Sequence, residues 1–255
     1  IDIIKEKSIL DRELMLMKEM IDFYKYDDGL ELAGLADITK MMNSIDIIGS
    51  YLSVEDLATL KKNLTIFRIS KSRAKNVRDK YKTIWNLFSD VEEVREIENF
   101  ISEAINDEGI LKDDASIGLR DVRRQKQNIN ANIKEKFDEL ISNKNTQNAI
   151  QERIVTQRND RYVIAVKTDF KGLVKGIEHD RSATGSTVYI EPLNVVSLNN
   201  KLREYEARER EEIRKILLRI TEIVKTKKEE ILEIKEILER LDLSLIHISE
   251  PTRPY

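Results

Sequence analysis

The sequence has no cysteine and few residues that interrupt regular structure. Its 255 residues include three prolines and eight glycines, and aromatic residues make up only 6%. The absence of cysteine excludes disulfides, thiolate metal sites and a cysteine nucleophile. The sequence also lacks an apolar run of about 18 residues and a signal-peptide pattern. We therefore expect a cytoplasmic protein that has no membrane partner.

What the sequence has in excess is charge. Charged residues make up 36% of the chain, whereas an average globular domain has about 25%. This excess favours long helices with much solvated surface. The formal net charge of −3 argues against a uniformly basic coat for nucleic acid, but it allows a local basic patch.

Residues 1–110 are predicted to form a helical core region. Helical spacing of apolar residues runs over residues 2–24, is broken at Gly29 and Gly34, and resumes in a short helix around residues 38–43. Ser53 with Asp56 three residues later is a capping-box signature, which predicts the start of the next helix.

Two blocks of opposite charge follow that helix start. Residues 61–82 contain nine Lys or Arg and one acid, and residues 90–108 contain eight acids and one Arg. The basic block could contact a polyanion, because Lys and Arg clusters release counterions from nucleic acid. We favour the alternative, in which it is a solvated helix face partly neutralised by the acidic helix beside it. Gly109 is expected to end the acidic helix.

Two long helices are expected on either side of a short strand-rich segment. In residues 111–152, Ser116 is a candidate N-cap for an ascending helix of about 25 residues. Residues 193–242 contain neither proline nor glycine and predict one long returning helix, whose apolar stripe is interrupted at Glu209 and Lys227. We expect the two helices to pair as an antiparallel arm.

Residues 153–192 are predicted to form a small antiparallel β-sheet at the tip of this arm. Residues 161–167 and 187–192 are dense in β-branched and aromatic residues. Between them, Gly172 marks a hairpin turn and residues 173–179 a middle strand. The predicted fold is therefore mainly α: an elongated helical core with a long antiparallel helix arm and a β-sheet of about three strands at the tip of the arm.

No catalytic, cofactor or metal site is expected in this chain. The phosphate-binding, dinucleotide-binding and zinc-protease patterns do not occur in the sequence. His179, Asp180 and Ser182 are residue types that form catalytic triads, but neighbours on a strand point to opposite faces. We interpret His179 as a structural hydrogen-bonding group, in preference to a metal ligand acting with Glu178 or Glu191.

The two ends of the sequence carry separate expectations. Residues 243–255 read LSLIHISEPTRPY and resemble the conceptual translation of a sequencing-library adapter, so we interpret them as an artefactual tail. The first residue is Ile1 and not methionine, which leads us to expect that the natural N-terminus is missing.

Two stretches carry a resemblance to a known family. They are RNDRYVIAVK at 158–167 and GIEHDRSATGSTVYIEP at 176–192, followed by Asn199 and Asn200. Together with segments at 35–38, 52–57 and 113–124, they make residues 1–242 resemble the MutS superfamily. The similarity is to its second bacterial branch, which lacks the mismatch-recognition domains.

Three positions depart from the pattern of that branch. Asp160 stands where the family usually has glycine, Ala165 where it has proline, and Glu178 where it has an apolar residue. We expect Asp160 to adopt a left-handed backbone conformation, which aspartate tolerates better than most residues.

The resemblance implies the function of a longer protein. Members of the branch are dimeric ATPases of the mismatch-repair family with a DNA-encircling clamp and an endonuclease module. It implies that ATP, Mg²⁺ and the nuclease site belong to a part beyond Asp242, and that this chain holds the core, lever and clamp. The implied partners are DNA, the ribosome and its RNA, and a second copy of the protein. The implied roles are suppression of recombination and rescue of stalled ribosomes, a form of ribosome quality control.

The candidate nucleic-acid contacts lie in the clamp tip. Residues 151–185 contain seven Lys or Arg and five acids, a modest excess that favours sequence-independent backbone contact. Hydroxyls of the 182–187 loop could also reach phosphate. The candidates are Arg158, Arg161, Lys167, Lys171, Lys175, Arg181, Ser182 and Thr187.

Each candidate has an alternative role as a plain surface charge or an ion pair within the sheet. We expect that replacing Arg161 and Lys167 by glutamate weakens polyanion binding without unfolding the arm. The alternative function is a structural coiled-coil adaptor that binds a protein through its tip. A steep loss of affinity with salt would identify the clamp.

Overall fold

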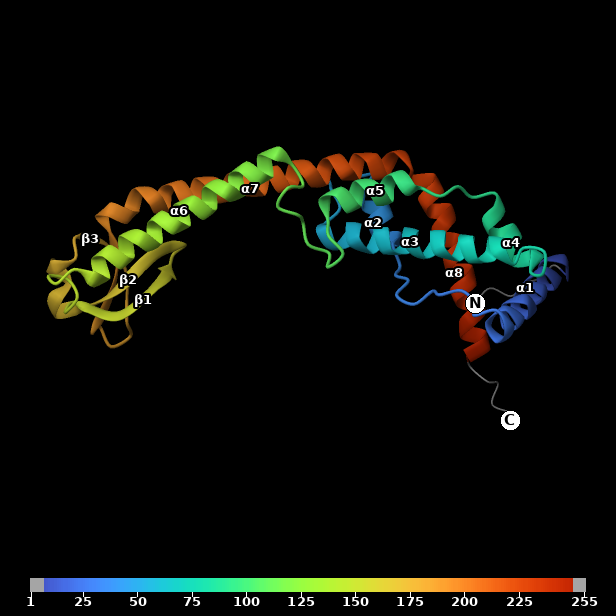
Figure 1. The fold of residues 1–255 in the computed structure, drawn as a ribbon, viewed down its shortest axis with the longest axis horizontal. Helices are drawn as coiled ribbons and strands as arrows, with labels where there is room; N and C mark the ends of the chain where they lie inside the picture. Colours follow the sequence, from blue (N-terminus) through green and yellow to red (C-terminus); the bar gives the residue numbers. More distant parts are fainter. Residues whose placement is uncertain (1–6, 250–255) are drawn as a thin grey trace. The chain divides into compact units, whose positions relative to one another are not determined.

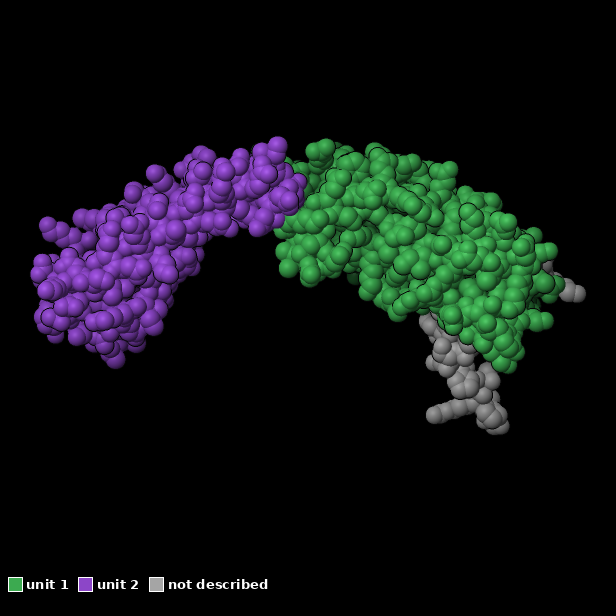
Figure 2. All heavy atoms as spheres, viewed as in Figure 1, with its two compact units in different colours: residues 1–112, 215–255 green, residues 113–214 purple. Residues whose placement is uncertain are grey.

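The computed structural model describes residues 7–249, with side chains described for residues 10–244. Over that range the chain forms eight α-helices, one 3₁₀-helix and one antiparallel sheet (Figure 1). The predicted mainly α fold with a small sheet is confirmed. The chain divides into unit 1, residues 1–112 and 215–255, and unit 2, residues 113–214 (Figure 2). Within the described range, every helix is too short or too polar to cross a lipid bilayer.

Unit 1 is helical, and its core lies between α1, α3, α4 and α8. Helix α3 opens with the predicted capping box, in which Ser53 accepts from the Asp56 N–H and the Asp56 carboxylate accepts from the Ser53 N–H. The largest buried side chains include Phe23, Phe67 and Phe88. The helices are α1 (Lys7–Tyr26), α2 (Thr39–Ser44), α3 (Val54–Asn76), α4 (Lys82–Ser89), α5 (Arg95–Ala104) and α8 (Lys228–Ser249), with the last part of α7.

The basic block of unit 1 is partly paired within the unit. On α3, Lys61 lies 3.0 Å from Asp107 and Arg68 lies 3.2 Å from Glu98 of α5. After α3, Lys80 lies 2.5 Å from Asp27. This arrangement agrees with the favoured interpretation of a partly neutralised helix face, although the acids come from more than one element.

The acidic helix α5 ends at Ala104, so the prediction that Gly109 ends it is wrong. Ile105 instead forms an antiparallel bridge with Leu111. The Lys112 N–H donates to the Ala104 carbonyl over 2.8 Å, which turns the chain back on itself. Gly109 lies in the turn with φ of +75°, a conformation that glycine adopts without a steric penalty.

The predicted single returning helix over residues 193–242 is also wrong. Helix α7 (Leu193–Thr226) and helix α8 are separated at Lys227, whose N–H donates to the Val224 carbonyl three residues back. The break is followed by a helix that packs against α1 and α3 in unit 1. Packing rather than a glycine or proline therefore accompanies the break, and α8 buries Ile231, Ile234, Leu238 and Leu241.

Unit 2 pairs α6 (Ile117–Ser142) with the first part of α7, as expected for the arm (Figure 1). Ser116 caps α6 by accepting the backbone N–H three residues on. Glu209, which interrupts the apolar stripe of α7, accepts from Arg123 of α6 over 2.9 Å and from Lys126. Burial raises the pKa of Glu209, but these hydrogen bonds outweigh it and lower the pKa below its ordinary value.

The sheet of unit 2 has four antiparallel strands rather than about three. Their order is β1-β2-β4-β3, with β1 (Ile150–Arg158), β2 (Arg161–Lys167), β3 (Gly176–Arg181) and β4 (Thr187–Pro192). Strand β1 was missed because it is polar and because its register with β2 shifts between Ile150 and Val155. Gly172 is not in a hairpin turn but in the 3₁₀-helix η1 (Thr168–Leu173).

One face of the sheet packs on the helix pair. Apolar residues of β2 and β4 join α6 and α7 in a single buried cluster. Since side chains alternate along a strand, Arg161 in β2 and Glu191 in β4 lie on the opposite face. The cluster includes Ile129, Ile133 and Phe137 of α6, Ile164 and Val166 of β2, Val188 and Ile190 of β4, and Val195 and Leu202 of α7.

Asn159 and Asp160 form the two-residue turn between β1 and β2. Their φ values of +51° and +58° are those of a type I′ hairpin, which favours glycine at the second position. The expected left-handed conformation of Asp160 is confirmed. We expect Asp160→Gly to stabilise unit 2 by about 0.5–1 kcal/mol, because glycine avoids the left-handed penalty.

Slower amide hydrogen exchange in β1 and β2 would measure this gain. The exposed ion pair of Asp160 with Arg203, at 3.6 Å, contributes little. Asp169→Gly removes a charge from η1, where the backbone is not left-handed, and is the matched control. Equal exchange in the two variants would contradict the assignment of strain to Asp160.

Candidate nucleic-acid interface

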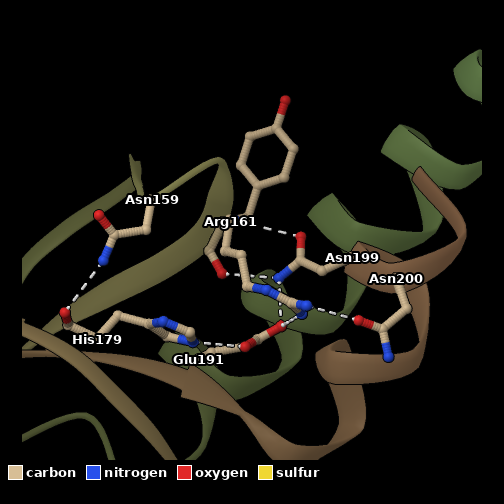
Figure 3. A network of polar contacts seen from close by, with 7 residues as sticks. Asn159, Arg161, His179, Glu191, Asn199 and Asn200 are labelled. Carbon is tan, nitrogen blue, oxygen red and sulfur yellow. Dashed lines mark hydrogen bonds and ion pairs between the residues drawn. The ribbon is translucent and has the colours of Figure 1, made fainter. Parts of the chain in front are cut away.

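Glu191 is the centre of a buried polar network in unit 2 (Figure 3). Its carboxylate is 0% exposed and accepts from Arg161 over 2.8 Å and from Asn199 over 2.8 Å. The Nε2 atom of His179 lies 2.6 Å from the other carboxylate oxygen. Burial raises the pKa of Glu191, but hydrogen bonds from Asn199, Arg161 and His179 outweigh it and hold the pKa below its ordinary value.

The network ties the sheet to the start of α7. The Asn199 amide accepts from the Tyr162 N–H over 3.2 Å and donates to the Tyr162 carbonyl over 3.1 Å. Asn200 accepts from the second terminal nitrogen of Arg161 over 2.7 Å. Asn159 in the β1–β2 turn donates to the His179 carbonyl over 3.3 Å. Arg161, His179 and Asn199 thus converge on one carboxylate, and Asn200 holds Arg161 (Figure 3).

The sequence suggested separate roles for Arg161 and His179 and offered Glu191 only as a metal-ligand alternative, so the contact of both residues with Glu191 was not predicted. His179 reaches Glu191 at an irregularity of β3, where the register with β4 shifts between Glu178 and Asp180. The available signal was a carboxylate in an otherwise apolar strand, since a buried charge needs partners.

His179, Asp180 and Ser182 do not converge on one another. Asp180 lies 3.2 Å from Arg158, and the Ser182 hydroxyl accepts from the Thr187 N–H over 3.1 Å. His179 forms a hydrogen bond with Glu191, which agrees with its interpretation as a hydrogen-bonding group. Among the residues that the structure describes, no three acidic, histidine or cysteine side chains gather in a way that could hold a metal ion.

Three of the predicted contact residues are engaged within unit 2. Arg161 is 18% exposed and bound to Glu191. Arg158 lies over the ring of Tyr189, 4.2 Å from its centroid, and pairs with Asp180. Thr187 is buried, so its hydroxyl is not on the surface.

The contact of Arg161 with Glu191 is a reason to expect that Arg161→Glu, alone or with Lys167→Glu, would disturb unit 2. The new carboxylate would face the buried carboxylate of Glu191 at the position that now holds its guanidinium partner. Two like charges in a buried site repel and lack compensation. Loss of binding in that variant would therefore report damage to the sheet, and other cations are needed to test contact with nucleic acid.

Four predicted cations lie on the surface around η1 and β3. Lys171 and Arg181 share Glu178, which Arg181 contacts directly and which lies 4.0 Å from Lys171. The hydrogen bond from Arg181 lowers the pKa of Glu178 below its ordinary value. Lys167 and Lys175 form no ion pair within the described part of the chain. These two lysines are the cations best placed to meet an external anion.

The 182–186 loop lies directly beside η1. Thr168 of η1 donates its hydroxyl to the Gly185 carbonyl over 2.6 Å and its N–H to the Ser186 carbonyl over 3.0 Å. Gly185, at φ of +71°, forms the turn of the loop. The loop leads into strand β4 and not into a helix, so it differs from a phosphate-binding loop of nucleotide-hydrolysing enzymes.

No family model matches the chain, but curated relatives do. Endonuclease MutS2 of Fusobacterium nucleatum is 48% identical over 239 residues, covering 94% of this chain and 31% of the relative. Endonuclease MutS2 of Aquifex aeolicus is 35% identical over 240 residues, 92% of this chain and 31% of the relative. The protein of that name from Caldanaerobacter subterraneus is 33% identical over 246 residues, which cover 95% of this chain and 30% of the relative.

The chain spans about a third of the length of these relatives. The matches cover more than nine-tenths of the chain and so include most of both units. The chain therefore belongs to the MutS superfamily, as a MutS2-like segment.

Proposed function

We propose that this chain is the core, lever and clamp part of a MutS-type ATPase, and that unit 2 contacts the backbone of nucleic acid. The observation that carries the proposal is the group of cations around η1 and β3: Lys167 at the end of β2, Lys171 in η1, Lys175 between η1 and β3, and Arg181 at the end of β3. Lys167 and Lys175, which lack an ion pair among the described residues, can neutralise phosphates at little cost. The modest charge excess suits contact that is independent of base sequence.

In this proposal the Glu191 network supports the contact and does not make it. Arg161, Asn199 and His179 hold three strands and α7 together, which keeps the surface cations in fixed positions. DNA and ribosomal RNA present the same phosphate chemistry, so both are proposed ligands. To the longer protein we assign ATP and Mg²⁺, an endonuclease, a homodimer, a cytoplasmic location, and a role in suppressing recombination or rescuing stalled ribosomes.

The test is the salt dependence of binding to a labelled DNA duplex, measured by fluorescence anisotropy. We expect Lys167→Ala with Lys175→Ala to weaken binding about tenfold. The slope of log affinity against log salt should fall by about 2, since each lost phosphate contact removes about one ion. The matched control is Lys136→Ala with Lys201→Ala, which removes two lysines from α6 and α7.

An unchanged affinity and slope in the Lys167 and Lys175 variant would show that these lysines are not contacts. If the unmodified chain binds neither DNA nor RNA in a salt-dependent way, the clamp proposal fails. The coiled-coil adaptor, which would bind a protein through its tip, would then be favoured.

A further inference from the structure

Phe170 differs from the other phenylalanines of the chain. Of the six in the sequence, Phe23, Phe67, Phe88 and Phe137 are at most 1% exposed, whereas Phe170 is 45% exposed. An aromatic ring on the surface loses the burial that normally stabilises it. The exposed ring is therefore available for contact with a ligand.

The geometry of η1 places Phe170 in a row of residues on its outer side. A 3₁₀-helix has three residues per turn, so residues three apart lie above one another. Phe170 and Leu173 are both exposed, and Lys167 precedes them at the N-cap of η1. The other side of η1 is held by Val174, which is buried in the core of unit 2, and by Thr168, which is bonded to the 182–186 loop.

The surroundings of the ring combine cations and hydroxyls with an apolar surface. Lys171 follows Phe170 directly, Lys167 lies three residues before it with Asp169 between them, and the 182–186 loop lies beside η1. Single-stranded nucleic acid offers both partners for such a surface, because its base faces are apolar and its backbone is anionic. A duplex hides its base faces. The centre of a protein interface is usually depleted of lysine, which makes a protein partner the weaker fit.

We propose that Phe170 is a stacking platform for an unpaired nucleobase, and that Lys167 and Lys171 meet the phosphates on either side. This inference rests on the proposed function and narrows it, because it names single-stranded or locally unpaired nucleic acid as the preferred ligand of unit 2.

The experiment compares binding of the whole 255-residue chain to a labelled 20-nucleotide thymidine strand and to a duplex of the same length. Phe170→Ala should weaken single-strand binding about tenfold, the range measured for loss of one base–aromatic stack, and leave duplex binding within about twofold. Phe170→Tyr keeps the ring and should retain affinity. Leu173→Ala, an aliphatic truncation in the same row, is the matched control and should change neither affinity more than about twofold.

Stacking can also be measured directly by the fluorescence of a tryptophan introduced at position 170. The chain has one tryptophan, Trp85, in α4 of unit 1. In the variant Phe170→Trp with Trp85→Phe, stacking on thymine should quench fluorescence when the single strand is added. The duplex should quench it much less.

The outcomes separate this inference from the function on which it rests. Equal loss of single-strand and duplex affinity in Phe170→Ala, or retained single-strand affinity without quenching, overturns the stacking platform. If the Lys167 and Lys175 variant still weakens binding, the clamp proposal stands. Unchanged nucleic-acid binding with reduced self-association in sedimentation would assign the ring to a protein contact and would also overturn the inference. Failure of the unmodified chain to bind either ligand overturns both.

Discussion

Replacing Glu191 by alanine is expected to lower the free energy of unfolding of unit 2 by about 3–5 kcal/mol, the usual cost of removing one partner from a buried ion pair. The substitution leaves Arg161 without its carboxylate and removes the acceptor of Asn199 and the contact of His179. Because these residues come from β2, β3 and α7, the loss should spread through the sheet.

Hydrogen exchange of the β2 and β4 amides is the appropriate measurement, since it reports unit 2 separately from unit 1. The matched control is Glu178→Ala, which removes an exposed carboxylate from β3. Exposed pairs contribute little, so this variant should exchange almost as slowly as the unmodified chain. If amide exchange accelerates equally in both variants, the network around Glu191 stabilises unit 2 no more than an exposed ion pair does.

Because the pKa of Glu191 is low, the contribution of this network to the stability of unit 2 depends on pH. Its ordinary value is 4.5, and the folded-state pKa is lower. The charged carboxylate therefore stabilises unit 2 fully above about pH 4.5, and this contribution is lost as the pH falls through the folded-state pKa. Glu191→Gln should be less stable than the unmodified chain at pH 7. The difference between their free energies of unfolding should become smaller on acidification below pH 4.5. A difference in free energy of unfolding that stays constant down to pH 3 would contradict the stabilising role of the charged carboxylate.

Phe137→Ala is expected to destabilise unit 2 by about 3–5 kcal/mol, the range for a fully buried phenylalanine. Phe137 is 0% exposed on α6 and belongs to the cluster that joins the helix pair to the sheet. Its loss leaves a cavity between the two layers, so exchange should accelerate in α6 and in β2 together. Nucleic-acid affinity should fall as well, because the sheet would no longer be held in place.

Ile141→Ala is the comparison for Phe137→Ala. Ile141 lies on the same helix, packs against the same cluster and is only partly buried. Its truncation should therefore lower the free energy of unfolding by about half as much as Phe137→Ala, or less. If both truncations accelerate exchange equally, the effect belongs to α6 as a helix and not to the contact between helix and sheet.

The elements that sequence predicted well are those fixed by short-range chemistry. The caps at Ser53 and Ser116 depend on hydrogen bonds that span three residues. Strands β2 and β4 were visible because β-branched and aromatic residues are dense in them. The break at Lys227 was not predicted: Lys227 interrupts the apolar stripe, but neither glycine nor proline stands there, and the packing of α8 in unit 1 that accompanies the break is not a local signal.

The candidate site was only partly predictable for a related reason. Each residue of the signature could be recognised, but their meeting depends on the pairing of Ile177 with Glu191 and on the irregularity that places His179 in reach. Register and bulges follow from how whole strands pack. From the sequence Arg161 was therefore predicted to be a surface cation, whereas in the fold it forms an ion pair with the buried Glu191.

The division into units has a consequence for how the chain is made. Unit 1 is discontinuous, and the whole of unit 2 lies between its two segments. A ribosome adds roughly 5–20 residues per second, so the first 112 residues wait on the order of ten seconds before α8 can emerge. During that interval the side chains that α8 covers have no partner, while unit 2 already has every residue of its own core. The inserted unit can finish folding first, and the N-terminal segment is the part of the nascent chain that needs protection from aggregation.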